Sequence, residues 1–311
     1  MTTRPLDLLD LPALYRHRDE AICLDTARLL TRGAPLGAMG FLSYFNPARH
    51  LYAAVAEENE NLLLGGISQS SGDDFARLLY LTPQANLTHP SLPALLEMLS
   101  AEAGLWGAFH VLAEVDEESP AIPALRRAGF SVYAWQRVWD LSEISSPEAV
   151  SSWQKIRPIQ IPALQNLFHQ IVPPLLHPIE SLPRRAEGLI CSENEKCYVG
   201  INQGARGLWL MPLIHPEASA VAEKLASLLA FLPQRRSRPV YLCVRSYQAW
   251  LESTLQDLGA KPGPRQAVMV KHLARKITMG EIRLVPELYK DVGKNGAIQP
   301  FLPYKIGKFR Y

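Results

Sequence analysis

The sequence contains only four cysteines, and their spacing gives neither a metal site nor a disulfide framework. There is no Cys-x-x-Cys pair, and no histidine lies near a cysteine at the spacing of a zinc site. This scarcity excludes a zinc finger and a disulfide scaffold. We therefore predict reduced, buried thiols in a cytoplasmic protein, at Cys23, Cys191, Cys197 and Cys243.

The chain also lacks a strong charge of either sign and any long apolar run. Its formal net charge is +2 over 311 residues, which gives no whole-molecule basic field for nucleic acid. No apolar run reaches the length of a membrane-spanning helix, and the first ten residues lack the apolar core of a signal peptide. We therefore expect neither nucleic acid nor a membrane as a partner. Hydrophobic residues make up 48% of the chain, enough for two domains with cores of their own.

Strand and helix signals follow one another in the stretch His110–Leu141. His110–Val115 is short and apolar, as in a buried strand. Ser119 stands before a proline and is a good N-cap for the helix that follows, while Gly129 suits a left-handed C-cap. Ser131–Leu141 alternates apolar and polar residues, which predicts a second strand.

The same order of signals recurs in Val240–Leu273. Leu125 corresponds to Leu255, and Gly129 to Gly259, at a constant offset of ~130 residues, which indicates duplication. A Ser-rich segment without periodicity separates the two copies. We therefore predict an N-terminal domain over 1–142, a linker over 143–152, a C-terminal domain over 153–273 and a basic arm over 274–311.

Earlier elements repeat as well. Arg77–Pro83 (RLLYLTP) and Arg206–Pro212 (RGLWLMP) predict matching strands, and an amphipathic helix follows each. A hairpin before the first of these strands contains Gly65 and Gly66, which predict a bulge or a close backbone approach. The sequence thus predicts two α/β units in tandem.

This order of elements resembles the Gcn5-related N-acetyltransferase (GNAT) family, in which Leu125, Gly129 and Phe130 match the end of a helix before the last strand. The resemblance implies two tandem GNAT-like units of the α/β class, each a mixed twisted sheet flanked by helices, plus the C-terminal arm. It also implies that the strand Arg77–Pro83 splays from the strand His110–Val115 to admit the pantetheine arm of acetyl-CoA, the expected co-substrate. The implied function is an acyl-CoA-dependent N-acetyltransferase whose acceptor is a small amine or a peptide amine.

The resemblance places the cofactor against the end of the fourth strand and the loop that follows. The acetyl carbonyl is expected near Leu81 and Thr82. Glu114 is expected to act as the catalytic base through water, with a solvent-side or salt-bridged carboxylate as the alternative. No metal is expected. The remaining cofactor contacts are expected at Gln84, Asn86, Thr88 and Ser119.

The chemical motifs of the family are incomplete in both halves. Its pyrophosphate loop is rich in glycine, because glycine lets backbone N–H groups converge on the phosphates, yet no glycine follows Pro83 or Pro212 before the next helix. Its usual general acid, a tyrosine, is replaced by Leu125 and Leu255, which have no proton to donate. We therefore keep a second hypothesis, a non-catalytic ligand-binding or protein-interaction module on a duplicated GNAT scaffold. Arg245 is expected either to hold a carboxylate or phosphate or to form a structural ion pair.

Overall fold

The computed structural model describes residues 2–37, 49–58, 61–144, 153–180, 188–191, 195–232 and 238–274. Met1–Arg275 forms one compact unit, and Lys276–Tyr311 lies outside the described residues. The predicted linker over 143–152 and the predicted arm over 274–311 also lie outside them, except at their first positions. No helix in the described ranges is both long and apolar enough to span a bilayer.

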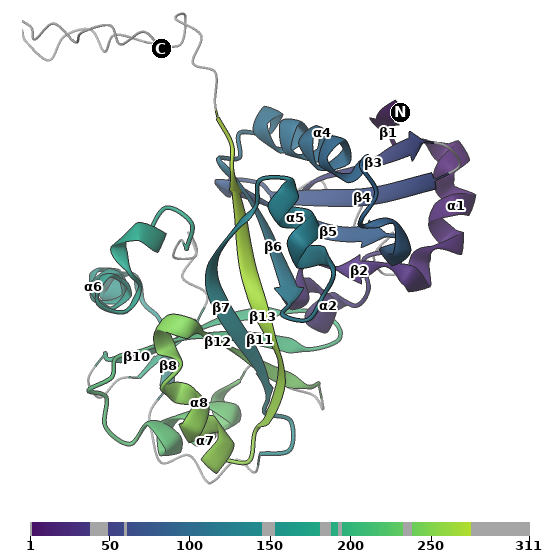
Figure 1. Ribbon diagram of the computed structural model, residues 1–311. Helices are drawn as coiled ribbons and strands as arrows, with labels where there is room; N and C mark the ends of the chain where they lie inside the picture. Colours follow the sequence, from purple (N-terminus) through teal and green to yellow (C-terminus); the bar gives the residue numbers. More distant parts are fainter. Residues whose placement is uncertain are drawn as a thin grey trace, which may run out of the picture. The chain divides into compact units, whose positions relative to one another are not determined.

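The first half of the chain forms a twisted sheet with helices on both faces (Figure 1). Helices α4 and α5 cover one face, and α1 packs on the other. The strands are β1 (Thr2–Pro5), β2 (Ile22–Cys23), β3 (Arg49–Glu58), β4 (Asn61–Ser70), β5 (Phe75–Thr82), β6 (His110–Asp116) and β7 (Ser131–Asp140). The helices are α1 (Leu11–Arg16), α2 (Thr26–Arg32), α4 (Leu92–Leu105) and α5 (Ala121–Arg127).

The second half repeats this order of elements. Helices α7 and α8 cover one face of its sheet, and α6 packs on the other. The strands are β8 (Trp153–Lys155), β9 (Gly188–Cys191), β10 (Cys197–Gln203), β11 (Leu208–Ile214), β12 (Val240–Arg245) and β13 (Lys261–His272). The helices are α6 (Ile161–Ile171), α7 (Val221–Phe231) and α8 (Leu251–Asp257).

The two halves exchange their last strands. The order along the sheet is β1-β3-β4-β5-β6-β13-β7-β12-β11-β10-β9-β8, so β13 of the second half lies between β6 and β7 of the first. In return, β7 pairs with β12. Both pairings of β13 are antiparallel, with Ala267 opposite Val115 on one side and Trp135 on the other. The halves therefore share one continuous sheet.

The exchange also mixes the cores. Ala267 and Met269 of β13 lie in the core beneath α4 and α5, with the apolar stripe Leu92–Leu99. Trp139 of β7 lies in the core beneath α7 and α8. Burial of these side chains stabilises a half to which they do not belong in sequence.

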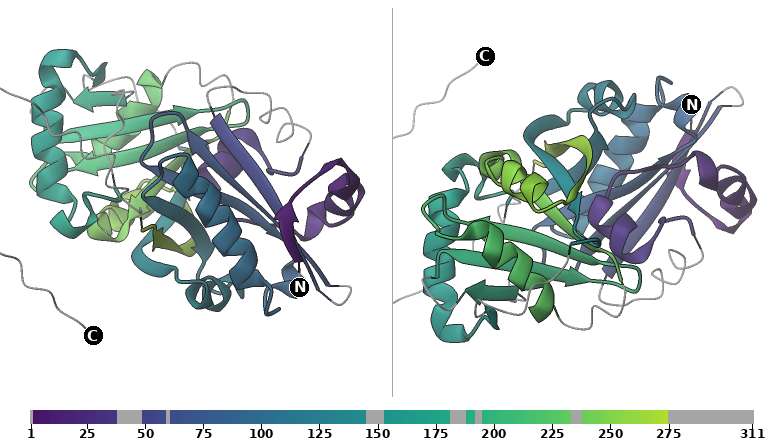
Figure 2. Two further views of the ribbon diagram at one scale, coloured as in Figure 1. Left: turned by 90° about the horizontal axis from the view of Figure 1, so that it is seen from above. Right: turned by 90° about the horizontal axis from the view of Figure 1, so that it is seen from below.

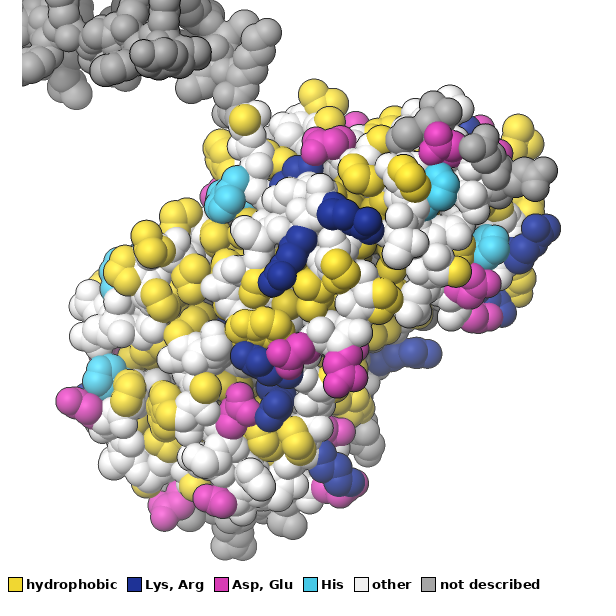
Figure 3. All heavy atoms as spheres, in the orientation of Figure 1, with side chains coloured by type: hydrophobic (Ala, Val, Ile, Leu, Met, Phe, Trp, Pro, Cys, Tyr) yellow, Lys and Arg dark blue, Asp and Glu magenta, His cyan; other side chains and the backbone are white. Residues whose placement is uncertain are grey.

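Further contacts join the halves away from the exchanged strands. Helix α2 packs against the second half (Figure 2). Leu30 of this helix lies in one apolar cluster with Trp209. On the exchanged strand β13 itself, Arg265 forms an ion pair with Glu117 at 2.8 Å. Acidic and basic side chains lie next to each other in the middle of the face in Figure 3. Such exposed pairs contribute only about 0–1 kcal/mol each, so the shared sheet and cores dominate the association.

The predicted splay is confirmed in both halves. β5 and β6 pair in parallel only from Phe75 to Arg77, opposite His110–Leu112, and then diverge. We call the gap beyond these residues the first wedge. β11 and β12 pair only over Leu208–Leu210, opposite Val240–Leu242, and the gap beyond them is the second wedge.

The structure corrects the register of one predicted match. Leu112 and Leu242 are equivalent in the repeat, and they pair with Arg77 and Leu210 respectively. The counterpart of Arg77 is therefore Leu210, whereas the sequence match had assigned Arg206, which lies before β11. The predicted hairpin is confirmed by the antiparallel pairing of β3 with β4. The prediction for Gly65 and Gly66 is confirmed as well, because the register of β4 against β5 shifts after Gly66, where a Cβ atom would overlap the Tyr80 ring.

Candidate functional site

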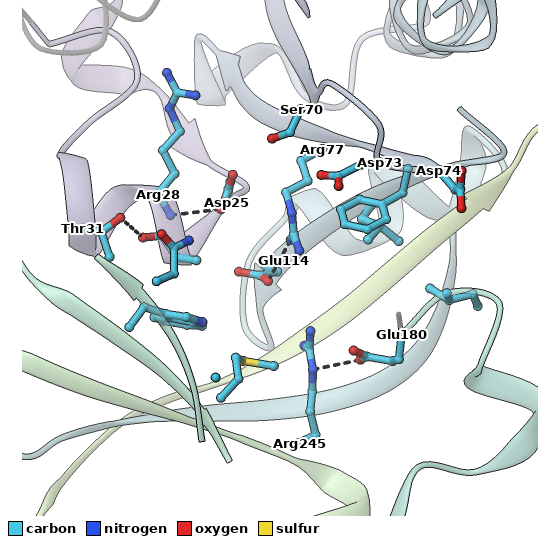
Figure 4. A pocket seen from close by; sticks show the side chains of 18 of the residues that line it. Asp25, Arg28, Thr31, Ser70, Asp73, Asp74, Arg77, Glu114, Glu180 and Arg245 are labelled. Atoms are coloured by element: carbon cyan, nitrogen blue, oxygen red, sulfur yellow. Dashed lines mark hydrogen bonds and ion pairs between the residues drawn. The ribbon is translucent and has the colours of Figure 1, made fainter. Parts of the chain in front are cut away.

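A cavity of about 390 Å³ lies between the two halves, on the sheet face opposite α4 and α5 (Figure 4). Alternation along β6 defines this face: Val111 and Ala113 pack beneath the helices, so Leu112 and Glu114 point the other way. Phe75 of β5 lines the same space. We call it the central cavity, and its walls come from α2 and β3–β7 in the first half and from α6 and β10–β12 in the second.

Glu114 lies at the centre of this cavity and is only 3% exposed. Its Oε2 accepts a hydrogen bond from the Thr26 backbone N–H at 2.9 Å, and Oε1 lies 3.3 Å from Nη1 of Arg77. The sequence left open whether this carboxylate faces a cleft or forms a salt bridge, and it does both. Its role as a base stays a prediction.

Asp25 is a second buried carboxylate of the cavity wall. It caps α2, because its Oδ1 accepts from the Arg28 backbone N–H at 3.0 Å. Burial raises the pKa of Asp25, and the nearby charge of Glu114 adds to the shift, while Arg77 and Arg28 oppose it. The charged form of Asp25 is therefore favoured by the neighbouring arginines.

Arg245 reaches the same cavity from the second half. Its Nε lies 2.9 Å from Oε1 of Glu180, and its Nη1 donates to the side-chain carbonyl of Gln136. Tyr133 donates from its hydroxyl to Glu180 at 3.2 Å, and burial raises the pKa of this tyrosine. Of the two alternatives for Arg245, the structural ion pair is confirmed. Figure 4 shows Arg77 and Arg245 extending from the two halves into one cavity.

The first wedge is occupied by the protein itself. β2 pairs with the open edge of β5, with Ile22 opposite Leu81. Leu24 then bridges β5 and β6. Its N–H donates to the Leu79 carbonyl, and its carbonyl accepts from the Glu114 N–H, both at 2.9 Å. The backbone groups that a pantetheine arm would contact are therefore already hydrogen-bonded within the chain.

The second wedge is occupied by one side chain. Gln248, which is 1% exposed, donates from Nε2 to the Pro212 carbonyl at 2.8 Å and accepts through Oε1 from the Ile214 N–H at 2.9 Å. A primary carboxamide thus takes the donor and acceptor positions on the edge of β11. Both wedges exist as predicted, and both are filled.

The residues predicted to contact the cofactor do not form one site. The Leu81 backbone is paired with Ile22, and the Thr82 hydroxyl donates to the His17 carbonyl at 2.6 Å. Asn86 donates to the Leu62 carbonyl at 2.9 Å, and Thr88 is exposed. These positions support the fold, and the expected acetyl contact at Leu81 and Thr82 is incompatible with the observed pairing.

Gln84 and Ser119 do come together, at a second cavity of about 850 Å³ beside the first wedge. Ser119 also accepts from the Ala121 N–H at 3.2 Å, in keeping with its predicted capping role. Asp116, Glu117 and Glu118 line the same cavity together with Arg18, Arg137 and Arg265, so its charge is mixed. What opposes acetyl-CoA in this half is the filled first wedge.

Sequence reasoning missed part of the central cavity. Arg28 and Arg32 of α2 and Arg49 of β3 all line it. The i, i+4 spacing of Arg28 and Arg32 places both on one side of the helix, which was the available signal, but nothing in the sequence indicates that this side meets the second half. Asp25 and Glu180 were missed for the same reason.

Comparison with known proteins tests the architecture. No protein-family model and no curated protein matches the sequence. Among solved structures, a GCN5-related N-acetyltransferase from Sphaerobacter thermophilus aligns with a TM-score of 0.52, over 89% of this chain and 96% of its own, at 13% identity. This chain has the GNAT fold. A tandem GNAT protein from the clavulanic acid biosynthesis pathway aligns with a TM-score of 0.48, over 89% of this chain and 99% of its own, at 15% identity.

The GNAT fold confirms the predicted α/β class and the resemblance read from the Gly129 corner. At 13% identity the likeness concerns the fold, and a fold does not specify an activity. Activity has to be argued from the site. In this chain the sites that bear on activity are the two filled wedges and the central cavity.

Replacing Gln248 tests whether its carboxamide closes the second wedge. Gln248→Ala leaves the Pro212 carbonyl and the Ile214 N–H without their partner in a buried setting, so we expect a loss of about 2–4 kcal/mol in the free energy of unfolding. Gln248→Glu keeps the acceptor but removes the donor, and it should cost at least as much because a charge is buried. Urea denaturation measures both. An unchanged midpoint for Gln248→Ala would contradict the assigned role.

The thiols give a prediction for alkaline pH. All four cysteines are free, as predicted, and burial raises the pKa of Cys243 to about 12. Below the unfolded pKa of about 8.5 the thiol is protonated in both states and has no effect. Above it only the unfolded chain ionises, so stability falls by about 1.4 kcal/mol per pH unit until the folded thiol also ionises. Urea denaturation from pH 8 to 10 should show a shallower decline for Cys243→Ala, and parallel declines would contradict the buried thiol's contribution.

Proposed function

We propose that this protein binds a small molecule in the central cavity and does not use its GNAT wedges for acetyl-CoA. The observation that carries the proposal is the filling of both wedges, by Ile22–Leu24 in the first half and by Gln248 in the second. A cofactor would have to displace hydrogen bonds that are already satisfied and buried. The central cavity offers space without that cost.

The central cavity has the features of a ligand site. Its volume of about 390 Å³ lies in the range of small-molecule pockets, which combine apolar walls with a few convergent polar groups. Phe168 and Trp209 supply aromatic surface from the second half, and Glu114 and Arg77 supply charge from the first. Both halves contribute residues to the cavity, so neither half could form this site alone.

The acetyltransferase hypothesis keeps one favourable observation, since Glu114 faces the cavity next to the first wedge. Acyl transfer from a CoA thioester to a small amine would need Ile22–Leu24 to leave β5. It would also need phosphates to bind in a cavity whose lining mixes Asp116 and Glu117 with Arg137 and Arg265. These requirements make ligand binding without acyl transfer the better supported function.

A thermal-shift experiment separates the two hypotheses. A ligand with micromolar affinity at about 1 mM stabilises its protein by roughly 4 kcal/mol. We expect no shift with acetyl-CoA or CoA. A clear upward shift with either would overturn the proposal and restore the acetyltransferase hypothesis.

The central cavity can be probed directly with the fluorescent dye 1-anilinonaphthalene-8-sulfonate, which combines an aromatic body with an anionic group. We expect it to bind the native protein and to lose most of its signal in Ser70→Trp, because Ser70 lines the cavity and is half-buried. Arg126→Trp on the exposed side of α5 is the matched control and should leave the signal unchanged. Equal signals in all three proteins would show that the dye binds elsewhere.

A further inference from the structure

We propose that Arg32 and Arg49 form an anion-binding site in the central cavity, so that the ligand is a small organic molecule with a carboxylate or phosphate group. This rests on the proposed function, because it assigns a ligand class to the same cavity. The two arginines come from helix α2 and strand β3, and both line the wall of the central cavity.

The positions of both side chains are fixed by the fold. Arg32 lies in the last turn of α2, whose first turn is held by the Asp25 cap and whose apolar side packs against Trp209. Arg49 is the first residue of β3 and pairs with Ser70 across the sheet. Both side chains are half-buried, so they are accessible to a ligand yet partly removed from water.

These two guanidinium groups lack an anion. In the described part of the chain neither makes a hydrogen bond or ion pair, in contrast to Arg77 and Arg245, which are held by Glu114 and Glu180. Half-buried cations without a direct ion-pair partner are costly. A bound anion would supply that partner.

The lowered pKa of Arg49 is consistent with the lack of an ion-pair partner. Burial and, to a smaller extent, repulsion from Arg32 and Arg28 together lower the pKa of Arg49 to about 10, although Asp25 and Asp73 oppose the shift. Repulsion between these groups shows that three arginines converge on one region. Guanidinium groups are suited to carboxylates and phosphates, which they bind in a bidentate manner.

The remainder of the cavity limits the ligand further. Phe168, Trp209 and Met211 form an apolar wall from the second half, and they suit an aromatic or aliphatic body attached to the anionic group. Asp73 and Asp74 also line the cavity and disfavour a second anionic group on their side. The chemistry therefore points to a monoanionic or phosphorylated compound with one apolar part.

The test compares the anionic dye 1-anilinonaphthalene-8-sulfonate with its neutral counterpart N-phenyl-1-naphthylamine. For the double variant Arg32→Gln/Arg49→Gln we expect at least about tenfold weaker binding of the anionic dye and unchanged binding of the neutral one. Arg126→Gln, on exposed α5, is the matched control and should bind both dyes as the native protein does. Competition by benzoate and by phenyl phosphate then separates a carboxylate site from a phosphate site.

The outcomes distinguish the two proposals. If Ser70→Trp has no effect on the dye, the cavity does not bind it, and both the proposed function and the anion site fail. If Ser70→Trp abolishes binding but the double arginine variant does not weaken it, the anion site alone fails. A second readout needs no ligand: Arg49→Gln should unfold at an equal or higher temperature than the native protein, because it removes a repelled cation. A clear drop would show that Arg49 has a structural partner and would overturn the assignment.

Discussion

Expressed alone, residues 1–148 are expected not to reach the native fold, although they contain every element of the first GNAT-like unit. The native partner of β6 on one side is β13, which runs from Lys261 to His272 and is absent from such a fragment. Without it, β6 and β7 each lose a neighbour, and the core beneath α4 and α5 loses Ala267 and Met269. Open strand edges of this kind promote aggregation.

Co-expression of 1–148 with 149–311 should restore a soluble complex, because each fragment then supplies the strand that the other lacks. Size-exclusion chromatography and far-ultraviolet circular dichroism measure the result. The control is the intact chain carrying a protease site in the predicted linker over 143–152, cleaved after folding, which should remain associated. If 1–148 gave a monomer with a cooperative unfolding transition, β7 would have taken the place of β13 beside β6, and the exchange would not be required for folding.

The sequence was sufficient for the order of elements and for the repeat. Short apolar strands, a proline at a helix start and glycine at a helix end are local signals, and each is read from a few residues. Gly129 and Gly259 have φ values of +87° and +83°, so the predicted left-handed positions are real. The splay in both halves was also correctly predicted.

The strand exchange was not predictable in the same way. β7 and β13 occupy equivalent positions in the repeat and have similar patterns, so nothing local determines which half each strand completes. The four-residue error in matching Arg77 has the same origin, because RLLYLTP and RGLWLMP align well as sequences while their pairing with the next strand differs. Partner choice is a property of the assembled sheet.

The site shows the same division. The element order predicted that Glu114 lies at the end of a buried strand near the wedge. The structure places it at the central cavity. The sequence did not predict that Ile22–Leu24 fills the first wedge, because so short a stretch shows no periodicity. The role of Gln248 did not follow either, because it depends on two backbone groups in β11 that are distant in sequence.

Trp139→Ala is expected to destabilise the second half of the chain, although Trp139 belongs to the first half by sequence. The Trp139 side chain is 2% exposed and packs in the core beneath α7 and α8. In the sheet, Trp139 pairs with Leu242 of β12. Removing a buried tryptophan side chain costs about 3–5 kcal/mol. Hydrogen exchange measured by mass spectrometry should therefore show the largest loss of protection in β12, α7 and α8.

Trp139→Phe is the matched control for this effect. The indole N–H of Trp139 is buried and has no hydrogen-bond partner in the described part of the chain, so replacing it removes an unsatisfied donor while keeping an aromatic ring in place. We expect a change of no more than about 1.5 kcal/mol. If Trp139→Ala instead reduced protection mainly in β6 and α5, the core beneath α7 and α8 would not depend on β7. The shared sheet would then be a contact between two independent units, and a cavity formed between those units would lose the rigid frame that ligand binding requires.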